Sequence, residues 1–288
     1  MRRRSIALLI LVALAACSTK KPIAPADVLW RQGNQGYDDE AWEYAIDNYK
    51  ALLDQHPFDA NVEEAELKVA MSYFFARRYA EAIAAFGDFE RMHPTSADRL
   101  AMVEYHLGLS YLAQGSTSDR DQDSTTNALQ YFRNLGERFP DSPWAEKAKL
   151  RTKECREALA SHERDVAAYY LRHGNLAAGE SRLRLLLTDY PDMDATADAL
   201  VTFAHAYERR DEPDGAQLAL ATVVRHHPGT PEAARAREQL GDASGATQGP
   251  DPLPQLVERL ARVSAQASRR QIPASVSAYP NTPPSGGY

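Results

Sequence analysis

Cys17 is the residue whose type and position most clearly indicate chemistry in this chain. It follows three arginines at positions 2–4, a short apolar run at Ile6–Leu14, and two alanines directly before it. A basic start, an apolar stretch and small residues at a cleavage point are the pattern of a secretory signal peptide. The run is too short to cross a bilayer whose hydrocarbon core is about 30 Å thick. We therefore expect residues 1–16 to be a signal peptide on an exported chain.

The four residues Leu14-Ala15-Ala16-Cys17 resemble the lipobox of bacterial lipoproteins. The resemblance implies that Cys17 becomes the first residue of the mature chain and carries the acyl chains. Ser18, where an aspartate would favour the inner membrane, implies the outer membrane, with the protein facing the periplasm. Residues 17–26 would then be an acylated N-terminus and tether. The alternative is an ordinary signal peptide with a chance cysteine.

The spacing Asp119-x-Asp121-x-Asp123 resembles the start of a calcium-binding loop. Such a loop has glycine at its sixth position and glutamate at its twelfth, where this chain has Ser124 and Gln130. We therefore expect a solvated loop and no metal site.

Two other reactive side-chain types lack the partners that catalysis needs. His162-Glu163 has no second histidine to complete a zinc-binding helix, and Cys155 has no identifiable base. We find no set of catalytic residues, so we expect a protein that is not an enzyme. We expect no cofactor except the lipid covalently bound to Cys17.

Charge and cysteine content exclude further classes. The net charge is −7, and without residues 1–16 the chain has 30 basic and 40 acidic residues, a net charge of −10. A nucleic-acid partner would require a basic stripe, so we expect none. With Cys17 acylated, Cys155 has no cysteine with which to form an intramolecular disulfide.

Five prolines share one upstream pattern, in which a small residue precedes a large apolar residue by four positions and the proline by twelve. The triplets are Ala45/Tyr49/Pro57, Ala82/Phe86/Pro94, Ala128/Phe132/Pro140, Gly179/Leu183/Pro191 and Ala216/Leu220/Pro228. Proline cannot continue a helix and disfavours helix at the residue before it. The sequence therefore indicates five repeats, each ending in a helix that stops near a proline.

This pattern resembles the tetratricopeptide repeat (TPR), in which a Leu-Gly-x2-Tyr segment precedes the small residue. Leu107-Gly108-x2-Tyr111 matches it, and Tyr73, Tyr170 and Tyr207 lie nine residues before the small residue of their repeats. We predict an all-α fold over residues 27–241, a TPR solenoid of about five helix pairs. The repeats end near Pro57, Pro94, Pro140, Pro191 and Pro228.

Departures from the regular repeat predict further elements. Residues 114–126 read as a polar loop inserted in the third repeat. Ser142-Pro143 begins one continuous helix, which has no Gly or Pro from Trp144 to His173 and ends at Gly174. Thr230-Pro231 begins a capping helix that ends at Gly241. Residues 242–288 are of low complexity and predict a mostly disordered tail, in which 253–263 could form a short amphipathic helix.

Aromatic residues are concentrated in the first repeats, where residues 30–111 hold 14 of the 25 in the chain. We expect most of them to form the repeat core. Phe58, Phe74 and Tyr79 lie off the repeat consensus, and rigid aromatic side chains suit peptide capture. We therefore predict that these three residues bind a substrate peptide.

Residues 10–235 resemble the BamD family, outer-membrane lipoproteins of the β-barrel assembly machine. The specific parts are Pro57-Phe58, Ser118-Asp119-Arg120-Asp121, and Ala168-x-Tyr170 ahead of Asp189-Tyr190-Pro191-Asp192. The family usually has proline where this chain has Gln122, and this tail is longer. These departures leave the loop contacts and accessory partners open.

The resemblance implies a scaffold that helps to recruit, fold and insert outer-membrane β-barrel proteins. It implies that the C-terminal repeats contact the periplasmic domains of the insertase BamA, and that the N-terminal repeats receive unfolded outer-membrane proteins. Other assembly-machine lipoproteins are further implied partners. Arg182 matches a family arginine on the BamA-facing surface, although it could be a solvated helix charge.

Two alternative classes share part of the pattern. A Tol–Pal-associated TPR cell-division coordinator has similar repeat ends, such as residues 139–143 and 227–231, but normally lacks a lipobox and carries an N-terminal coiled coil. A type IV pilus pilotin is also a TPR lipoprotein, but it lacks the Pro-Phe and Ser-Asp-Arg-Asp features.

Overall fold

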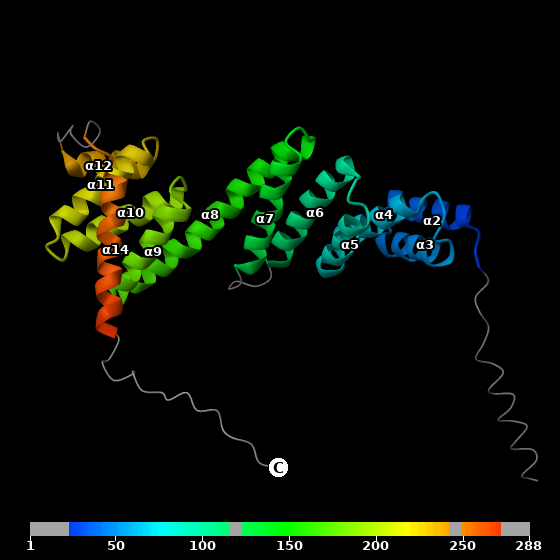
Figure 1. Ribbon diagram of the computed structural model, residues 1–288, viewed down its shortest axis with the longest axis horizontal. Coiled ribbons are helices and arrows are strands. Elements are labelled where there is room, and N and C mark those ends of the chain that lie inside the picture. Colours follow the sequence, from blue (N-terminus) through cyan, green and yellow to red (C-terminus); the bar gives the residue numbers. More distant parts are fainter. Residues whose placement is uncertain (1–22, 116–121, 242–248, 272–288) are drawn as a thin grey trace, which may run out of the picture. The chain divides into compact units, whose positions relative to one another are not determined.

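The computed structural model describes residues 23–115, 122–241 and 249–271, with side chains as far as residue 262. Cys17, the predicted signal peptide and the first two aspartates of the calcium-like motif lie outside these residues. Every regular element in the described part is a helix (Figure 1). None of these helices is long and apolar enough to cross a membrane. The predicted all-α class is therefore confirmed.

The described residues form two compact units, of which the first comprises residues 23–115 and 137–145. Its complete helices pack each on the next along the chain. They are α2 (Ala26–Asp38), α3 (Trp42–Gln55), α4 (Val62–Phe75), α5 (Tyr79–Met92) and α6 (Ala97–Gly115).

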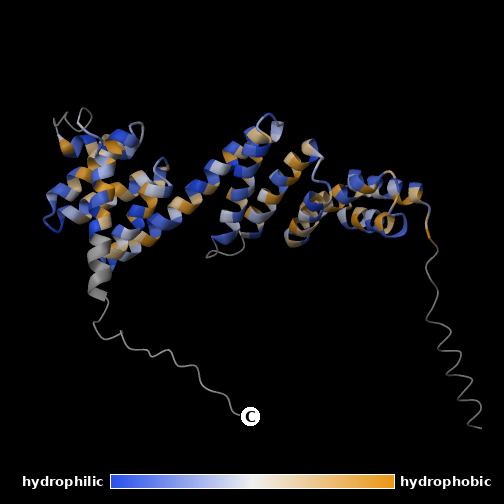
Figure 2. Ribbon diagram, in the orientation of Figure 1, coloured by the Kyte–Doolittle hydropathy of each residue, from blue (hydrophilic) through white to orange (hydrophobic). Residues whose placement is uncertain are grey.

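The second unit comprises, among the described residues, 122–136, 146–241 and 249–271. It contains most of α7 (Asp123–Arg138) and α8 (Pro143–Arg172), and all of α9 (Leu176–Asp189), α10 (Asp194–Glu208), α11 (Pro213–His226), α12 (Pro231–Leu240) and α14 (Pro252–Gln271). Helix α10 packs against α9, α11 and α12, while α14 lies across α9 and α11. Figure 2 shows hydrophilic and hydrophobic residues mixed along these helices, as amphipathic packing requires.

The small and large positions of the repeat pattern are buried in all five repeats. A small residue lets two helices approach closely, and the large residue fills the groove beside it. The fourth repeat shows the limit of this approach. A Cβ atom on Gly179 would lie 3.1 Å from Cζ of Phe203, so this position has no room even for alanine without a shift.

Helix ends follow the prolines as predicted. Helices α3, α5, α9 and α11 stop two residues before a repeat proline, and α7 stops at Arg138, also two residues before one. The 30-residue helix α8 and the capping helix α12 begin at Pro143 and Pro231, as expected. The hydroxyl of Thr230 accepts a hydrogen bond from the backbone N–H of Ala233 and caps α12.

The turn inside a repeat uses a left-handed residue five positions before the small residue. Glu40, Arg77 and Asp211 have φ values of 56°, 60° and 60°, and Gly174 has a φ of 75°. Gly174 ends α8 as predicted, because glycine has no Cβ to oppose this conformation. The other three turns place an ordinary side chain in the same conformation.

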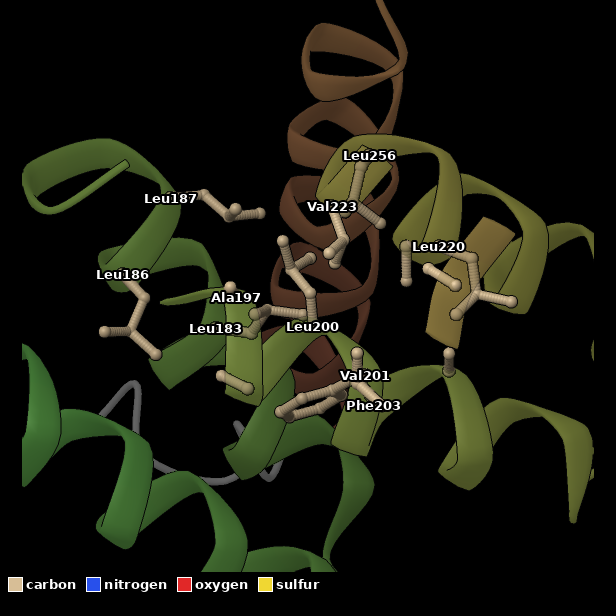
Figure 3. Close-up of a cluster of buried hydrophobic side chains, with 14 of the residues drawn as sticks. Leu183, Leu186, Leu187, Ala197, Leu200, Val201, Phe203, Leu220, Val223 and Leu256 are labelled. Atoms are coloured by element: carbon tan, nitrogen blue, oxygen red, sulfur yellow. The ribbon is translucent and has the colours of Figure 1, made fainter. Parts of the chain in front are cut away.

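Two expectations need correction. The polar loop predicted at residues 114–126 is shorter, because α6 runs to Gly115 and α7 begins at Asp123. The tail after Gly241 is also more structured than predicted, because α14 spans Pro252–Gln271 and packs in the second unit. Leu256 and Leu260 of α14 are fully buried in the hydrophobic cluster of that unit (Figure 3). Apolar cover from the repeats supplies the burial that this segment could not obtain alone.

The first described residues are fixed to the end of α3. The backbone N–H of Ala24 donates to Oε1 of Gln55 at 3.0 Å, and the carbonyl oxygen of Ala24 lies 2.7 Å from Nε2 of His56. Gln55 and His56 stand 31 and 32 positions after Ala24, so the two contacts fix the first described residues to the first repeat.

Candidate functional site

Five aromatic side chains of the first two repeats form a contiguous array, here called the aromatic row. Trp42 stacks on Phe75 with ring centroids 4.9 Å apart, and Tyr37 lies 5.4 Å from Trp42. Phe75 contacts Phe74 at 5.5 Å, and Phe74 contacts Tyr79 at 6.0 Å. These separations are typical of stabilising aromatic pairs. The structure therefore brings two of the predicted peptide-binding residues, Phe74 and Tyr79, into one surface.

The repeat register places the row. Tyr37 and Trp42 flank the turn between α2 and α3, and Phe74 and Tyr79 occupy the same positions one repeat later, 37 residues on. Trp42, Tyr37 and Phe75 were not singled out from the sequence. The sequence could have identified Tyr37 and Trp42, because a shift by the 37-residue period places Tyr37 at the position of Phe74 and Trp42 at the position of Tyr79. Phe75 is the most exposed ring of the row, at 42%.

Phe58 is not part of the row. It lies in the turn between α3 and α4, the connection between repeats, and its side chain is 99% exposed. The structure therefore does not bring Phe58 together with Phe74 and Tyr79. A peptide role for Phe58 by itself stays a prediction.

Cations lie at the edges of the row. Nζ of Lys68 lies 4.1 Å from the ring centroid of Tyr37, a cation–π contact. Burial, with help from the nearby charges of Glu64 and Asp38, raises the pKa of Tyr37, so its hydroxyl stays a hydrogen-bond donor. Arg78 donates to both carboxylate oxygens of Glu43 at 3.0 and 2.7 Å, which joins the two repeats.

The row can bind but offers no group for catalysis. Half-buried rings present apolar faces and edges at fixed positions, which can accept aromatic or aliphatic side chains of an extended peptide at low entropic cost. Among the described residues, no three His, Cys, Asp or Glu side chains are grouped to hold a metal ion. Cys155 is buried, and burial raises the pKa of its thiol to about 11, so the reactive thiolate is scarce at neutral pH.

Arg182, the predicted BamA-facing residue, projects from α9 and is 40% exposed in its side chain. Its Nη1 donates to Oε2 of Glu163 on α8 at 3.0 Å. The charge is therefore paired with a carboxylate that is itself only 17% exposed. Arg182 can present part of its guanidinium to a partner, but it also joins α8 to α9.

In the second unit, α8 also bonds to the turn between α9 and α10 and to the start of α10. Arg156 of α8 donates two hydrogen bonds to the carboxylate of Asp192, at 2.8 and 2.6 Å. These bonds hold the pKa of Asp192 below its usual range. Glu157 accepts hydrogen bonds from the backbone N–H groups of Asp194 and Ala195 at 3.0 and 2.9 Å, so α8 supplies the N-terminal cap of α10. Neither role was evident from the sequence, because both partners lie more than 30 residues away.

Paired helices that repeat a small-large-proline pattern define a tetratricopeptide-repeat protein. The model of the outer membrane lipoprotein family YfiO matches residues 22–223 of this chain. The chain belongs to this family.

The curated relatives carry one common name. The chain is 29% identical over 215 residues to the outer membrane protein assembly factor BamD of Vibrio cholerae, covering 70% of this chain and 89% of the relative. It is 26% identical to BamD of Caulobacter vibrioides, covering 70% and 68% of the two chains. For BamD of Haemophilus influenzae the identity is 28%, with coverage of 72% and 84%.

Among solved structures, the chain is similar to the TPR2AB domain of yeast Sti1 in a complex with an Hsp90 peptide. The TM-score is 0.40 at 15% identity, covering 84% of this chain and 98% of the other. A likeness this distant supports no functional argument.

Proposed function

We propose that the protein is an assembly factor for outer-membrane β-barrel proteins, held at the periplasmic face of the outer membrane by a lipid on Cys17. Its relatives' shared name and the match over residues 22–223 support this role. The lipobox-like sequence at Leu14–Cys17 supports the anchor. The protein acts as a scaffold rather than an enzyme.

The aromatic row is the observation that supports a mechanism of substrate binding. An unfolded outer-membrane protein binds the first two repeats through aromatic and aliphatic side chains of its C-terminal segment. The rings of Phe74, Phe75 and Tyr79 receive these side chains. The C-terminal repeats, with Arg182, contact BamA, and other assembly lipoproteins bind elsewhere on the scaffold.

Photo-crosslinking tests the division between substrate and insertase. A photoreactive residue at position 75 should capture a peptide that ends in an aromatic residue, and one at position 182 should capture BamA. Phe75→Ala should weaken peptide binding, while Tyr169→Ala should not, because Tyr169 is a similarly exposed aromatic residue in the other unit. Peptide capture only in the C-terminal repeats would contradict this assignment.

Arg182 needs a control because it pairs with Glu163. Arg182→Glu alone leaves two carboxylates facing each other, which could disturb α8 and α9. The double variant with Glu163→Arg restores an ion pair but leaves no arginine on α9 at this position. If Arg182 contacts BamA, co-purification of BamA stays weak in the double variant. If the double variant restores co-purification, Arg182 has only a structural role.

A further inference from the structure

A pocket of about 370 Å³ opens on the first unit between α3, α4 and α5. Its apolar lining includes Leu53, Val69, Tyr73, Phe89 and Met92. Met92 is 51% exposed, although it is one of the larger apolar side chains. No helix of the described residues covers this pocket, here called the α3–α5 groove. None of its lining residues belongs to the aromatic row.

The equivalent surface in the second unit is occupied. There α14 lies across α9 and α11, the second helices of their repeats, just as α3 and α5 are in theirs. Leu256 and Leu260 of α14 are fully buried in one cluster with Leu187 and Val223 (Figure 3). The protein therefore shows what kind of element fills this groove: an amphipathic helix with aliphatic residues four positions apart.

The repeat register matches the two surfaces residue by residue. Leu53 and Leu187 each stand eight residues after the small residue of their repeat, and Phe89 and Val223 each stand seven after theirs.

The edges of the two grooves match as well. Met92 corresponds to His226, whose Nε2 lies 2.8 Å from a carboxylate oxygen of Asp251, just before α14. Glu81 corresponds to Gly215, where an added Cβ would lie 3.1 Å from Arg259 of α14. Two positions at the edge of the α3–α5 groove thus correspond to residues that lie against α14 or the residue just before it.

One difference between the two grooves indicates which sequence a helix bound in the first unit would have. In the second unit, the guanidinium of Arg259 lies 5.1 Å from the ring centroid of Tyr207. In the first unit, the corresponding tyrosine, Tyr73, is already covered by Arg78 of the same unit, at 4.7 Å. A helix in the α3–α5 groove therefore needs no arginine at the position of Arg259, and one there would meet the charge of Arg78.

We propose that the α3–α5 groove binds an amphipathic helix of a partner protein, with aliphatic residues at i and i+4 like those of α14 in the equivalent groove. The carboxylates that line the groove are already paired, Glu81 with Arg78, Asp88 with Arg91 and Glu66 with His93, so apolar contact dominates the binding. A second copy's α14 is a poorer occupant, because α14 is buried in its own groove. This inference extends beyond the proposed function, since the helix would bind apart from the aromatic row.

A peptide of residues 252–271 with Arg259→Ala is the probe. It retains Leu256 and Leu260, which are four positions apart. The full chain, labelled with ¹³C at its five methionine methyl groups, reports on binding by NMR. We expect a saturable shift of Met92 and none of Met193, which is buried in the cluster around α14. The same peptide with Leu256→Asp and Leu260→Asp should leave Met92 unchanged.

A matched pair of variants locates the binding. Ala84 lines the groove and Ala80 does not, and both are exposed on α5. Ala84→Arg should weaken the peptide at least tenfold, and Ala80→Arg should have no effect. The proposal fails if Met92 does not respond to saturating peptide, or if Ala84→Arg binds as tightly as the native chain. It also fails if Met92 shifts with protein concentration alone, because a second copy would then be the occupant.

Discussion

Glu104 of α6 is a carboxylate that is 1% exposed, beside Arg138 and Glu90. Arg138 donates a hydrogen bond to its Oε1, while Oε2 is buried without a hydrogen-bond partner. Burial disfavours the charged form and raises the pKa of Glu104 to about 7 against the opposing charge of Arg138. Between about pH 4.5 and 7, Glu104 is therefore protonated in the folded protein but ionised in the unfolded chain.

This shift predicts the direction in which stability depends on pH. A carboxylate with a raised pKa makes the fold more stable at low pH, and the free energy of unfolding falls as pH rises from about 4.5 to 7. Glu104→Gln removes this titration. At about 1.4 kcal/mol per pKa unit, the wild type should lose up to ~3 kcal/mol relative to the variant across this window. Denaturant unfolding of both proteins at pH 5 and pH 8 measures the difference.

Glu180 provides the internal control. Burial raises its pKa too, and its Oε1 accepts a hydrogen bond from the hydroxyl of Tyr207. Because Glu180 is present in both proteins, the difference between their pH profiles reports Glu104. Parallel profiles would show that Glu104 stays ionised when buried.

At the level of elements, the turns inside the repeats contain avoidable strain. A left-handed residue other than glycine costs about 1–2 kcal/mol. Arg77 is exposed with a φ of 60°, so Arg77→Gly should raise the free energy of unfolding by up to about 1 kcal/mol. Gly174→Ala should lower it by about 1 kcal/mol. An added Cβ at Gly174 meets nothing within 4 Å, so the cost there is conformational only. Urea unfolding measures the free energy of unfolding of both variants and of the wild type. If all three were equally stable, backbone strain at these positions would be excluded.

The small position makes a second prediction for the helices. Ala82 is fully buried where α5 packs, and Ala80 is exposed two residues earlier on the same helix. Ala82→Leu should overpack the interface and cost about 1–3 kcal/mol, whereas Ala80→Leu should change stability by less than about 0.5 kcal/mol. Thermal melts compare the two. Similar melting temperatures would mean that the packing register is wrong.

The elements that the sequence predicted well carry local signals. Pro143, Gly174, Thr230 and the repeat prolines determine helix ends through their own backbone chemistry. Helix α14 was underestimated because its stability depends on distant partners. Leu256 and Leu260 gain their burial from α9 and α11, about 30 to 80 residues earlier in the sequence. The start of α7 was misplaced because Asp123–Thr126 reads as polar, although aspartate is favourable in the first turn of a helix.

The candidate site was only partly predictable for the same reason. Phe74 and Tyr79 followed from their position off the repeat consensus. Phe75 joins them through its stacking on Trp42, which depends on how two repeats pack. Phe58 has a sequence context as conspicuous as theirs, yet it lies in the other kind of turn. Composition identifies candidate rings, but packing decides which of them share a surface.

At the level of the whole molecule, the anchor can be tested separately from the repeats. Cys17→Ala removes the acylation site, so the protein should leave the outer-membrane fraction and accumulate as soluble or unprocessed chain. Its melting temperature should match that of the native repeats, because Cys17 precedes α2, the first helix of the repeats. Membrane fractionation with a radioactive fatty acid label measures the change. Label retained by Cys17→Ala would contradict lipid attachment at this residue.

The attachment of Ala24 to Gln55 and His56 limits how far the protein can reach from the membrane. If the lipid is on Cys17, it lies only seven positions along the chain from this fixed point. A fully extended chain of that length spans at most about 25 Å, whatever path it takes. The first repeat is therefore confined to a layer close to the lipid headgroups. A client arriving at the aromatic row would be captured next to the bilayer that it must enter, and lengthening residues 18–22 should uncouple capture from insertion.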